Sequence, residues 1–504
     1  MQRLTGLDAA FLQMETATNH MHVMAAAVLD PGEAEGGFTV DTLRALVADR
    51  IERLPPFRRR LVTVPFSLHH PLWVEDPGFD LAYHVRRVAV PSPGGRRDLA
   101  EVMGEIASRQ LDRARPLWEM WVAEGLEHGR TAIIAKVHHS AIDGASGVDV
   151  LAQLVDIEPR TVPARDIGAA ADDDGDAHTG VREWDGERVP SEIEMVLGSV
   201  ISIARQPAKV LKAVRGVTGS AMRVISRLRH EDIQTGAPFA APRLPFNAMI
   251  TAHRQVAYAE APLADVQAVR DAFGVTVNDV VLAVVAGAMR RYLDHLDALP
   301  DTPLVAVVPT SVRSADEHGD MGNRVSAMFT QLATELDDPV ERLFAARDAM
   351  TDAKLVHSDI GGDTLAELAE VVAPSLLWGG ARLFGQLRLA ERVRPILNVV
   401  VSNVPGPDFP LYFGTARLLE LYPMGPIFDG AGLNVTVISY LDTIHVGLMA
   451  CRETVSELWH LADAFPPALV ELVERAREHP VEPPVTATTG RTGTPAGSGE
   501  AVEE

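Results

Sequence analysis

The feature that most constrains this chain is a short apolar run that ends in two adjacent histidines. Residues 131–137 are rich in β-branched and other apolar side chains, and the run is short and bounded, which predicts a buried strand. His138 and His139 follow, then a loop, and then apolar residues at helical spacing over 147–157. Loops at strand ends are where α/β folds present functional groups. We therefore predict an α/β fold with its chemistry at this loop.

The loop carries the pattern HHxxxDG between His138 and Gly144. A histidine titrates near neutral pH and can take a proton from an alcohol as the oxygen attacks an acyl group. We predict that His139 is this general base and that His138 belongs to the same site. Asp143 is predicted to have a structural role, of which capping the following helix is the simplest form. Gly144 permits a sharp turn between loop and helix.

Other motifs give less support for chemistry. His69 and His70 are also adjacent, but no Asp-Gly follows at the required spacing, so we expect them to be structural. His20 and His22 alternate along a predicted strand, which is more typical of packing. The chain has no G-x-S-x-G elbow and no G-x-x-x-x-G-K phosphate loop. Adjacent histidines without other nearby ligands make a poor metal site, so we expect no metal.

Length, charge and cysteine content limit the class of protein. With 504 residues the chain exceeds one ordinary core and suggests two domains. Its formal net charge of −23 opposes general binding to nucleic acid. Cys451 is the only cysteine, which excludes an intrachain disulfide and fits a reducing cytosol. We see no secretory signal, and the apolar runs are shorter than the ~18 residues of a membrane span. We expect a cytoplasmic protein with, at most, peripheral membrane contact.

Composition divides the chain into segments. We predict, in order, a first α/β domain over 1–160, a disordered acidic linker over 161–192, basic amphipathic crossover helices over 193–245, a second α/β domain over 246–479 and a disordered tail over 480–504. In the second domain, Gly274 is predicted to end a helix over 263–273, and Thr276 to cap a buried helix over 277–293. Strands are predicted over 304–308, 397–404 and 433–440, with 444–451 as a hairpin partner of the last.

Residues 193–230 reverse the acidic character of the chain. Seven arginines and lysines face a single acid, Glu194, and apolar residues recur every three or four positions. This pattern predicts amphipathic helices that bind anionic lipid or CoA phosphates. Ordinary helices that cross between the domains fit the same pattern, and the two interpretations are compatible.

Several further motifs carry a family resemblance. They are RPLW at 115–118, Val277-Asn278-Asp279, SNVPGP at 402–407, LDAAFL at 7–12 and Met21-His22-Val23. Together with HHxxxDG, they resemble the bacterial wax ester synthase/diacylglycerol acyltransferase family, which is related to chloramphenicol acetyltransferase. The resemblance runs from Leu4 to about Cys451.

This resemblance implies two chloramphenicol acetyltransferase-like domains with a tunnel between them. Acyl-CoA, a substrate rather than a cofactor, would enter from one side and a lipid alcohol from the other. It implies that His139 is the base and that Asp143 pairs with an arginine to hold the loop. No metal or prosthetic group is implied.

Four residues of the second half are candidates for substrate binding: Asn278, Asp279, Ser402 and Asn403. Asn278 would lie at a helix N-terminus, where amide and backbone N–H groups face developing negative charge. Bonding to the neighbouring backbone explains Asn278 equally well, and the same choice is open for Ser402 and Asn403.

The sequence therefore predicts an acyl-CoA-dependent diacylglycerol O-acyltransferase that makes triacylglycerol. The closest alternative is a wax ester synthase that acylates fatty alcohols. A second alternative keeps the fold but takes acyl groups from a carrier protein. A third is a catalytically silent protein of membrane or lipid-droplet surfaces, against which the intact HHxxxDG argues.

Overall fold

The computed structural model describes residues 2–32, 37–65, 69–142, 152–161, 191, 194–195, 240–311, 325–360 and 394–479. The predicted linker over 161–192, the basic stretch over 193–230 and the tail over 480–504 lie almost entirely outside these ranges. Asp143 and Gly144 also lie outside them, together with residues 147–151 of the helix predicted over 147–157.

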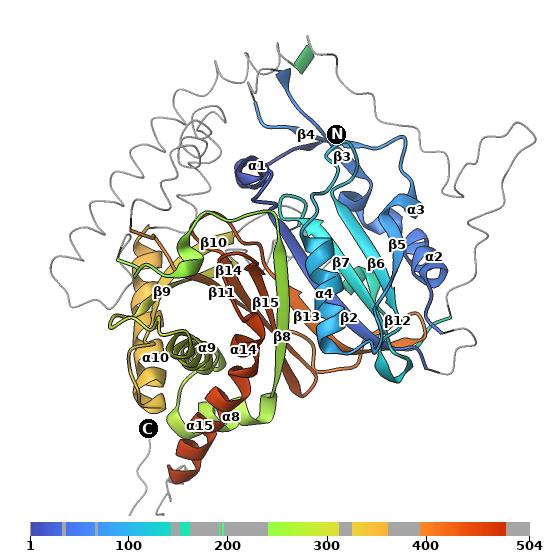
Figure 1. Cartoon of the computed structure of the whole chain (residues 1–504). Helices are drawn as coiled ribbons and strands as arrows, with labels where there is room; N and C mark the ends of the chain where they lie inside the picture. The colour runs from blue at the N-terminus through green and yellow to red at the C-terminus, as the bar shows by residue number, and fades with distance from the viewer. Residues whose placement is uncertain are drawn as a thin grey trace, which may run out of the picture.

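The first sheet contains the strand that ends in the two histidines. Its described strands run in the order β12-β13-β2-β7-β6-β5 (Figure 1). These are β12 (Tyr412–Phe413), β13 (Ala416–Met424), β2 (His22–Asp30), β7 (Thr131–His138), β6 (Trp118–Glu124) and β5 (Val85–Ala89). β2 and β7 are antiparallel, with His22 opposite His138. The strand predicted over 131–137 is confirmed and includes His138.

Two helices cover opposite faces of this sheet. On one face, α2 (Val40–Arg50) buries Leu43, Leu46 and Val47 in a core with side chains of β2 and β7. On the other face, α4 (Arg96–Ala107) buries a second set of apolar side chains. The core around α4 also includes residues of β8 and β15 from the second sheet. α4 is therefore packed between the two sheets.

The second sheet runs in the order β10-β9-β11-β14-β15-β8 in the described part of the chain. Its strands are β8 (Arg254–Pro262), β9 (Leu304–Ser311), β10 (Val325–Leu332), β11 (Val399–Val404), β14 (Leu433–Tyr440) and β15 (Thr443–Cys451). β14 and β15 form the predicted hairpin. The helices that pack with this sheet are α8 (Leu263–Phe273), α9 (Val277–His295), α10 (Pro339–Ile360), α14 (Leu458–Asp463) and α15 (Phe465–Glu478).

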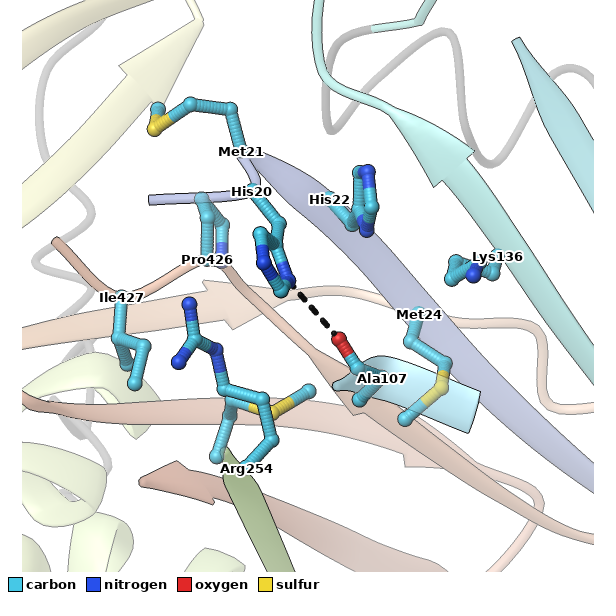
Figure 2. Close-up of a pocket in the computed structure, with 10 residues that line it drawn as sticks. His20, Met21, His22, Met24, Ala107, Lys136, Arg254, Pro426 and Ile427 are labelled. Atoms are coloured by element: carbon cyan, nitrogen blue, oxygen red, sulfur yellow. Dashed lines mark hydrogen bonds between the residues drawn. The ribbon is translucent and has the colours of Figure 1, made fainter. Parts of the chain in front are cut away.

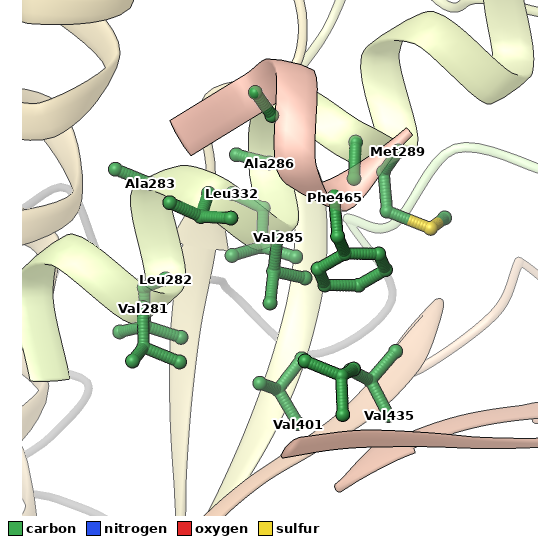
Figure 3. Close-up of a cluster of buried hydrophobic side chains, with 14 of the residues drawn as sticks. Val281, Leu282, Ala283, Val285, Ala286, Met289, Leu332, Val401, Val435 and Phe465 are labelled. Atoms are coloured by element: carbon green, nitrogen blue, oxygen red, sulfur yellow. The ribbon is translucent and has the colours of Figure 1, made fainter. Parts of the chain in front are cut away.

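Helix α9 forms the centre of the second core, as predicted. Figure 3 shows Val281 and Val285 above the sheet residues Val401 and Val435, with Phe465 of α15 beside them. The helix ends also follow local sequence. Gly274 ends α8 in the left-handed region at φ 64°, and the side chain of Thr276 caps α9.

Among the described helices, none is both long and apolar enough to cross a membrane on its own. α8 and α9 meet that requirement only as a pair, bent by 108°.

The two halves of the sequence share the first sheet. β13 comes from the second half, yet it pairs antiparallel with β2 of the first half. β13 also lies directly against β15, because Gly447 has no side chain: a Cβ there would overlap the carbonyl oxygen of Pro423. The domain boundary predicted at residue 246 thus separates the two halves of the sequence but not the two sheets. The first sheet includes β12 and β13, which come after this boundary.

A small third sheet carries the N-terminus. β1 (Gln2–Arg3), β4 (Leu72–Glu75) and β3 (Arg59–Val62) pair in that order. Helix α1 (Gly6–Met14) follows β1 and is capped by Thr5, whose hydroxyl oxygen accepts the N–H of Asp8 at 3.1 Å. In Figure 1, α1 lies above the space between the two large sheets, near the start of β2 and the end of β7, where the paired histidines are found.

Candidate active site

The backbone at the end of β7 is held from both sides. The N–H of His138 donates to the carbonyl of Leu117 at 3.0 Å, and the N–H of His139 donates to the carbonyl of Met21 at 2.9 Å. A turn then closes, because the N–H of Ala141 donates to the carbonyl of His138 at 2.9 Å. The direction in which the two imidazoles leave the strand is therefore fixed by neighbouring strands.

His138 is fully buried and neutral. Its Nδ1 accepts the N–H of Ser140 at 3.0 Å and lies 2.7 Å from the Ser140 hydroxyl. Because Nδ1 accepts a backbone N–H, the ring proton must be on Nε2. That nitrogen faces Oε2 of Glu15 at 3.7 Å. Burial, with smaller effects of Arg113 and His139, lowers the pKa of His138 to about 3.

His139 is half-buried, and its ring stacks on Phe11 of α1. The two ring centroids are 4.1 Å apart and the planes are inclined by 21°. Phe11 orients the imidazole through its face and leaves the ring edge, where the nitrogens lie, for polar partners. Of the paired histidines, the second is thus the more exposed one.

Two of the predicted substrate-binding residues meet. Nδ2 of Asn403, at the end of β11, donates to Oδ1 of Asn278 in the first turn of α9 at 3.3 Å. Asp279 is assigned to the helix cap, since its carboxylate accepts the N–H of Thr276 at 2.9 Å. Ser402 lies in register with Thr436 on the neighbouring strand. Contact of these residues with substrate stays a prediction.

The roles of Asp143 and Gly144 also stay predictions, because both residues lie outside the described ranges. Within those ranges, no three histidine, cysteine, aspartate or glutamate side chains are placed to hold a metal ion.

His20 and His22 lie beside the paired histidines, which the sequence pattern did not indicate. Both are buried, as expected of packing residues, but the ring of His22 lies 5.9 Å from that of His138 and 5.5 Å from that of His20. Burial lowers the pKa of both. Figure 2 shows them with Arg254 around a small cavity, and a hydrogen bond joins His20 to the carbonyl of Ala107.

Lys136 links this region to the end of α4. Its fully buried ammonium donates to the carbonyls of Ile106 at 3.1 Å and Arg109 at 2.9 Å, and lies 3.4 Å from Glu119. Burial lowers the pKa of Lys136, and Glu119 opposes that shift. A cation at the last carbonyls of a helix is favoured by the helix dipole. Lys136 therefore joins β7, two residues before His138, to α4 between the sheets.

Comparison with known proteins identifies relatives over nearly the whole chain. The sequence profile of the wax ester synthase/diacylglycerol acyltransferase catalytic domain matches residues 4–281, and that of the WS/DGAT C-terminal domain matches residues 321–473. "Putative diacyglycerol O-acyltransferase Rv1760" of Mycobacterium tuberculosis (strain H37Rv) is 37% identical, over 95% of this chain and 92% of its own. "Putative diacyglycerol O-acyltransferase Rv3740c" of the same organism is 38% identical, over 94% and 99%.

Solved structures show the same fold. The wax ester synthase/diacylglycerol acyltransferase from Marinobacter aquaeolei VT8 is 28% identical, with a TM-score of 0.65, covering 95% of this chain and all of that one. The first condensation domain of the CDA synthetase matches with a TM-score of 0.54 at 15% identity, covering 95% and 96%. The predicted pair of chloramphenicol acetyltransferase-like α/β domains is confirmed by these matches.

Proposed function

The chain belongs to the wax ester synthase/diacylglycerol acyltransferase family, and we propose that it transfers a long-chain acyl group from acyl-CoA to diacylglycerol, giving triacylglycerol and free CoA. The observation that carries the proposal is the state of the paired histidines. One is buried, neutral and engaged with its own turn, and the other is half-buried and directly follows β7. This arrangement supports His139 as a general base.

The reaction follows from an imidazole held beside an alcohol and a thioester. His139 takes the hydroxyl proton of the acceptor while the oxygen attacks the thioester carbonyl carbon, which forms the C–O bond and a tetrahedral oxyanion. Collapse of this intermediate breaks the C–S bond, and the leaving sulfur takes the proton back from the imidazolium. His139 returns to its neutral form, so no external oxidant, reductant or metal is required by the balance of the step.

The pair formed by Asn278 and Asn403 supports a role for the second half of the chain in this step. Amide N–H groups at the start of α9 lie where its dipole favours negative charge. Asn278 and Asn403, with Ser402 beside them, are proposed to face the acyl group and its oxyanion. Asp279 is proposed to act by fixing the helix end that carries Asn278.

Diacylglycerol is proposed as the acceptor because the curated relatives carry that activity in their names. Acylation of fatty alcohols is the second candidate, favoured by the family description and by the name of the Marinobacter structure. Purified protein with labelled palmitoyl-CoA and either diacylglycerol or hexadecanol tests this choice. Labelled triacylglycerol as the main product supports the proposal. A wax ester as the main product would make the fatty alcohol the acceptor in place of diacylglycerol. If free acyl-CoA gives neither product, the proposed acyl donor is contradicted.

Peripheral association with a cytoplasmic membrane or lipid-inclusion surface is a further part of the proposal. It is supported by the basic, amphipathic sequence over 193–230 in a chain of net charge −23. Each basic side chain near an anionic surface contributes ~1 kcal/mol, screened over ~10 Å at 0.1 M salt.

We expect flotation with anionic liposomes to fail when this charge is removed. The variant carries glutamine, which keeps helix propensity, at Arg205, Lys209, Lys212, Arg223 and Arg227. Turnover of a detergent-dispersed acceptor should persist. A variant that still floats refutes the membrane interpretation, and a variant that also loses turnover in detergent assigns these residues to the fold or to CoA binding.

A further inference from the structure

We infer that Glu15 is a positioning residue for the acyl transfer: through His138 it fixes the turn that presents His139. The inference rests on the proposed function, because it concerns the same base. Glu15 is the C-cap residue directly after α1, and its carboxylate approaches the buried histidine from the side opposite to Ser140.

A single short helix reaches both histidines. Phe11 and Glu15 are four residues apart, so they project from the same side of α1. Phe11 stacks on His139 at 4.1 Å, and Oε2 of Glu15 lies 3.7 Å from Nε2 of His138. A displacement of α1 would therefore disturb both rings together.

Glu15 is buried, so a charge on its carboxylate requires partners within the protein. The side chain is only 4% exposed, and burial raises its pKa, while Arg113 and Gln110 oppose that shift. Nε of Arg113 donates to Oε2 at 2.6 Å, and Nε2 of Gln110 lies 3.4 Å from Oε1. A carboxylate in such a place is costly unless it is paired. Arg113 supplies the pairing, and the same oxygen faces the imidazole.

The charge selects one tautomer of His138. At 3.7 Å the contact is longer than a hydrogen bond, but a carboxylate still favours a proton on the nitrogen that faces it. With the proton on Nε2, Nδ1 accepts the N–H of Ser140 at 3.0 Å. With the proton on Nδ1, two donors would face each other at that distance, and the turn over 138–141 would lose this hydrogen bond. The turn that presents His139 thus depends on a tautomer that Glu15 stabilises.

A purely structural role gives a different expectation. Arg113 also donates to the carbonyl of Leu12, so Glu15 could act only by anchoring the end of α1. In that case its loss would cost activity whether or not His138 is present. If Glu15 acts through His138, the loss of activity on replacing Glu15 and the loss on replacing His138 are not additive.

The test is a double-mutant cycle. Glu15→Gln is expected to lower kcat about 10–100-fold, the cost of a misplaced catalytic group, with the KM for palmitoyl-CoA within about twofold of wild type. In a His138→Gln background, Glu15→Gln should lower kcat by less than about twofold more. Additive losses, or a Glu15→Gln enzyme with wild-type kcat, overturn the inference.

A matched control removes another glutamate from an arginine pair. Oε2 of Glu471 on α15 accepts from Arg342 at 3.0 Å, in the helices of the second sheet. Glu471→Gln should keep wild-type kcat, since it lies outside the site.

A second measurement does not depend on activity or on any variant at position 15. In protein labelled with 15N-histidine, the signal that is lost in His138→Gln should report a protonated Nε2 and an unprotonated Nδ1. The opposite tautomer overturns the inference. If wild-type protein forms no triacylglycerol, the proposed function fails, and a spectrum of the opposite tautomer would still overturn the role of Glu15.

Discussion

Replacing His139 with alanine is expected to lower turnover by about 10²–10⁴-fold, the usual range for loss of a general base. His139 is half-buried and its backbone N–H is held by Met21, so the strand end does not depend on the imidazole. The variant should therefore remain folded. The measurement is the initial rate of CoA release from palmitoyl-CoA with diacylglycerol present, beside a circular dichroism spectrum of the same sample.

The control is a histidine outside the site. His253 is mostly exposed and bonds to Glu453, so His253→Ala should keep the wild-type rate. A folded His139→Ala protein with a near-normal rate of ester formation would show that another group removes the proton.

Replacing Lys136 with alanine is expected to lower the free energy of unfolding by about 3–5 kcal/mol, as for removal of one partner from a buried ion pair. The ammonium of Lys136 satisfies the carbonyls of Ile106 and Arg109 at the end of α4, and it lies beside Glu119. Alanine leaves these groups buried without that donor and also opens a cavity. Urea unfolding followed by fluorescence measures the change.

Two further variants serve as controls for this prediction. Lys354→Ala, at an exposed position of α10, should change the free energy of unfolding by no more than about 0.5 kcal/mol. Lys136→Met keeps most of the side-chain volume and should lower the free energy of unfolding less than Lys136→Ala, because only the polar part of the side chain is removed. A Lys136→Ala protein as stable as wild type would mean that water replaces the ammonium at the end of α4.

The elements that were predicted correctly are those specified by neighbouring residues. Helix α9 begins directly after Thr276 because the side chains of Thr276 and Asp279 accept each other's backbone N–H groups within one turn. Helix α8 ends at Gly274 because that residue adopts φ 64° without strain. The apolar run over 131–137 predicted β7, and the HHxxxDG pattern placed the candidate site at the end of this strand.

The contacts that were not predicted join residues far apart in the sequence. Nothing near 416–424 indicates that β13 pairs with β2 of the first half as well as with β12 of its own half. The position of His22 opposite His138 depends on the register of β2 against β7, and a slip of one residue would turn His22 to the other face. The approach of Glu15 to His138 depends on how α1 packs, which no local pattern specifies.

The central claim is that the acyl group passes directly from CoA to the acceptor while His139 removes the proton. Single-turnover mixing of excess enzyme with labelled palmitoyl-CoA, with and without diacylglycerol, tests it most directly. Without acceptor, we expect no rapid release of CoA and no label on the protein. With diacylglycerol, we expect CoA and labelled triacylglycerol in equal amounts. Stoichiometric CoA release without acceptor, with the label bound to the protein, would contradict the claim, because it would make a side chain the nucleophile.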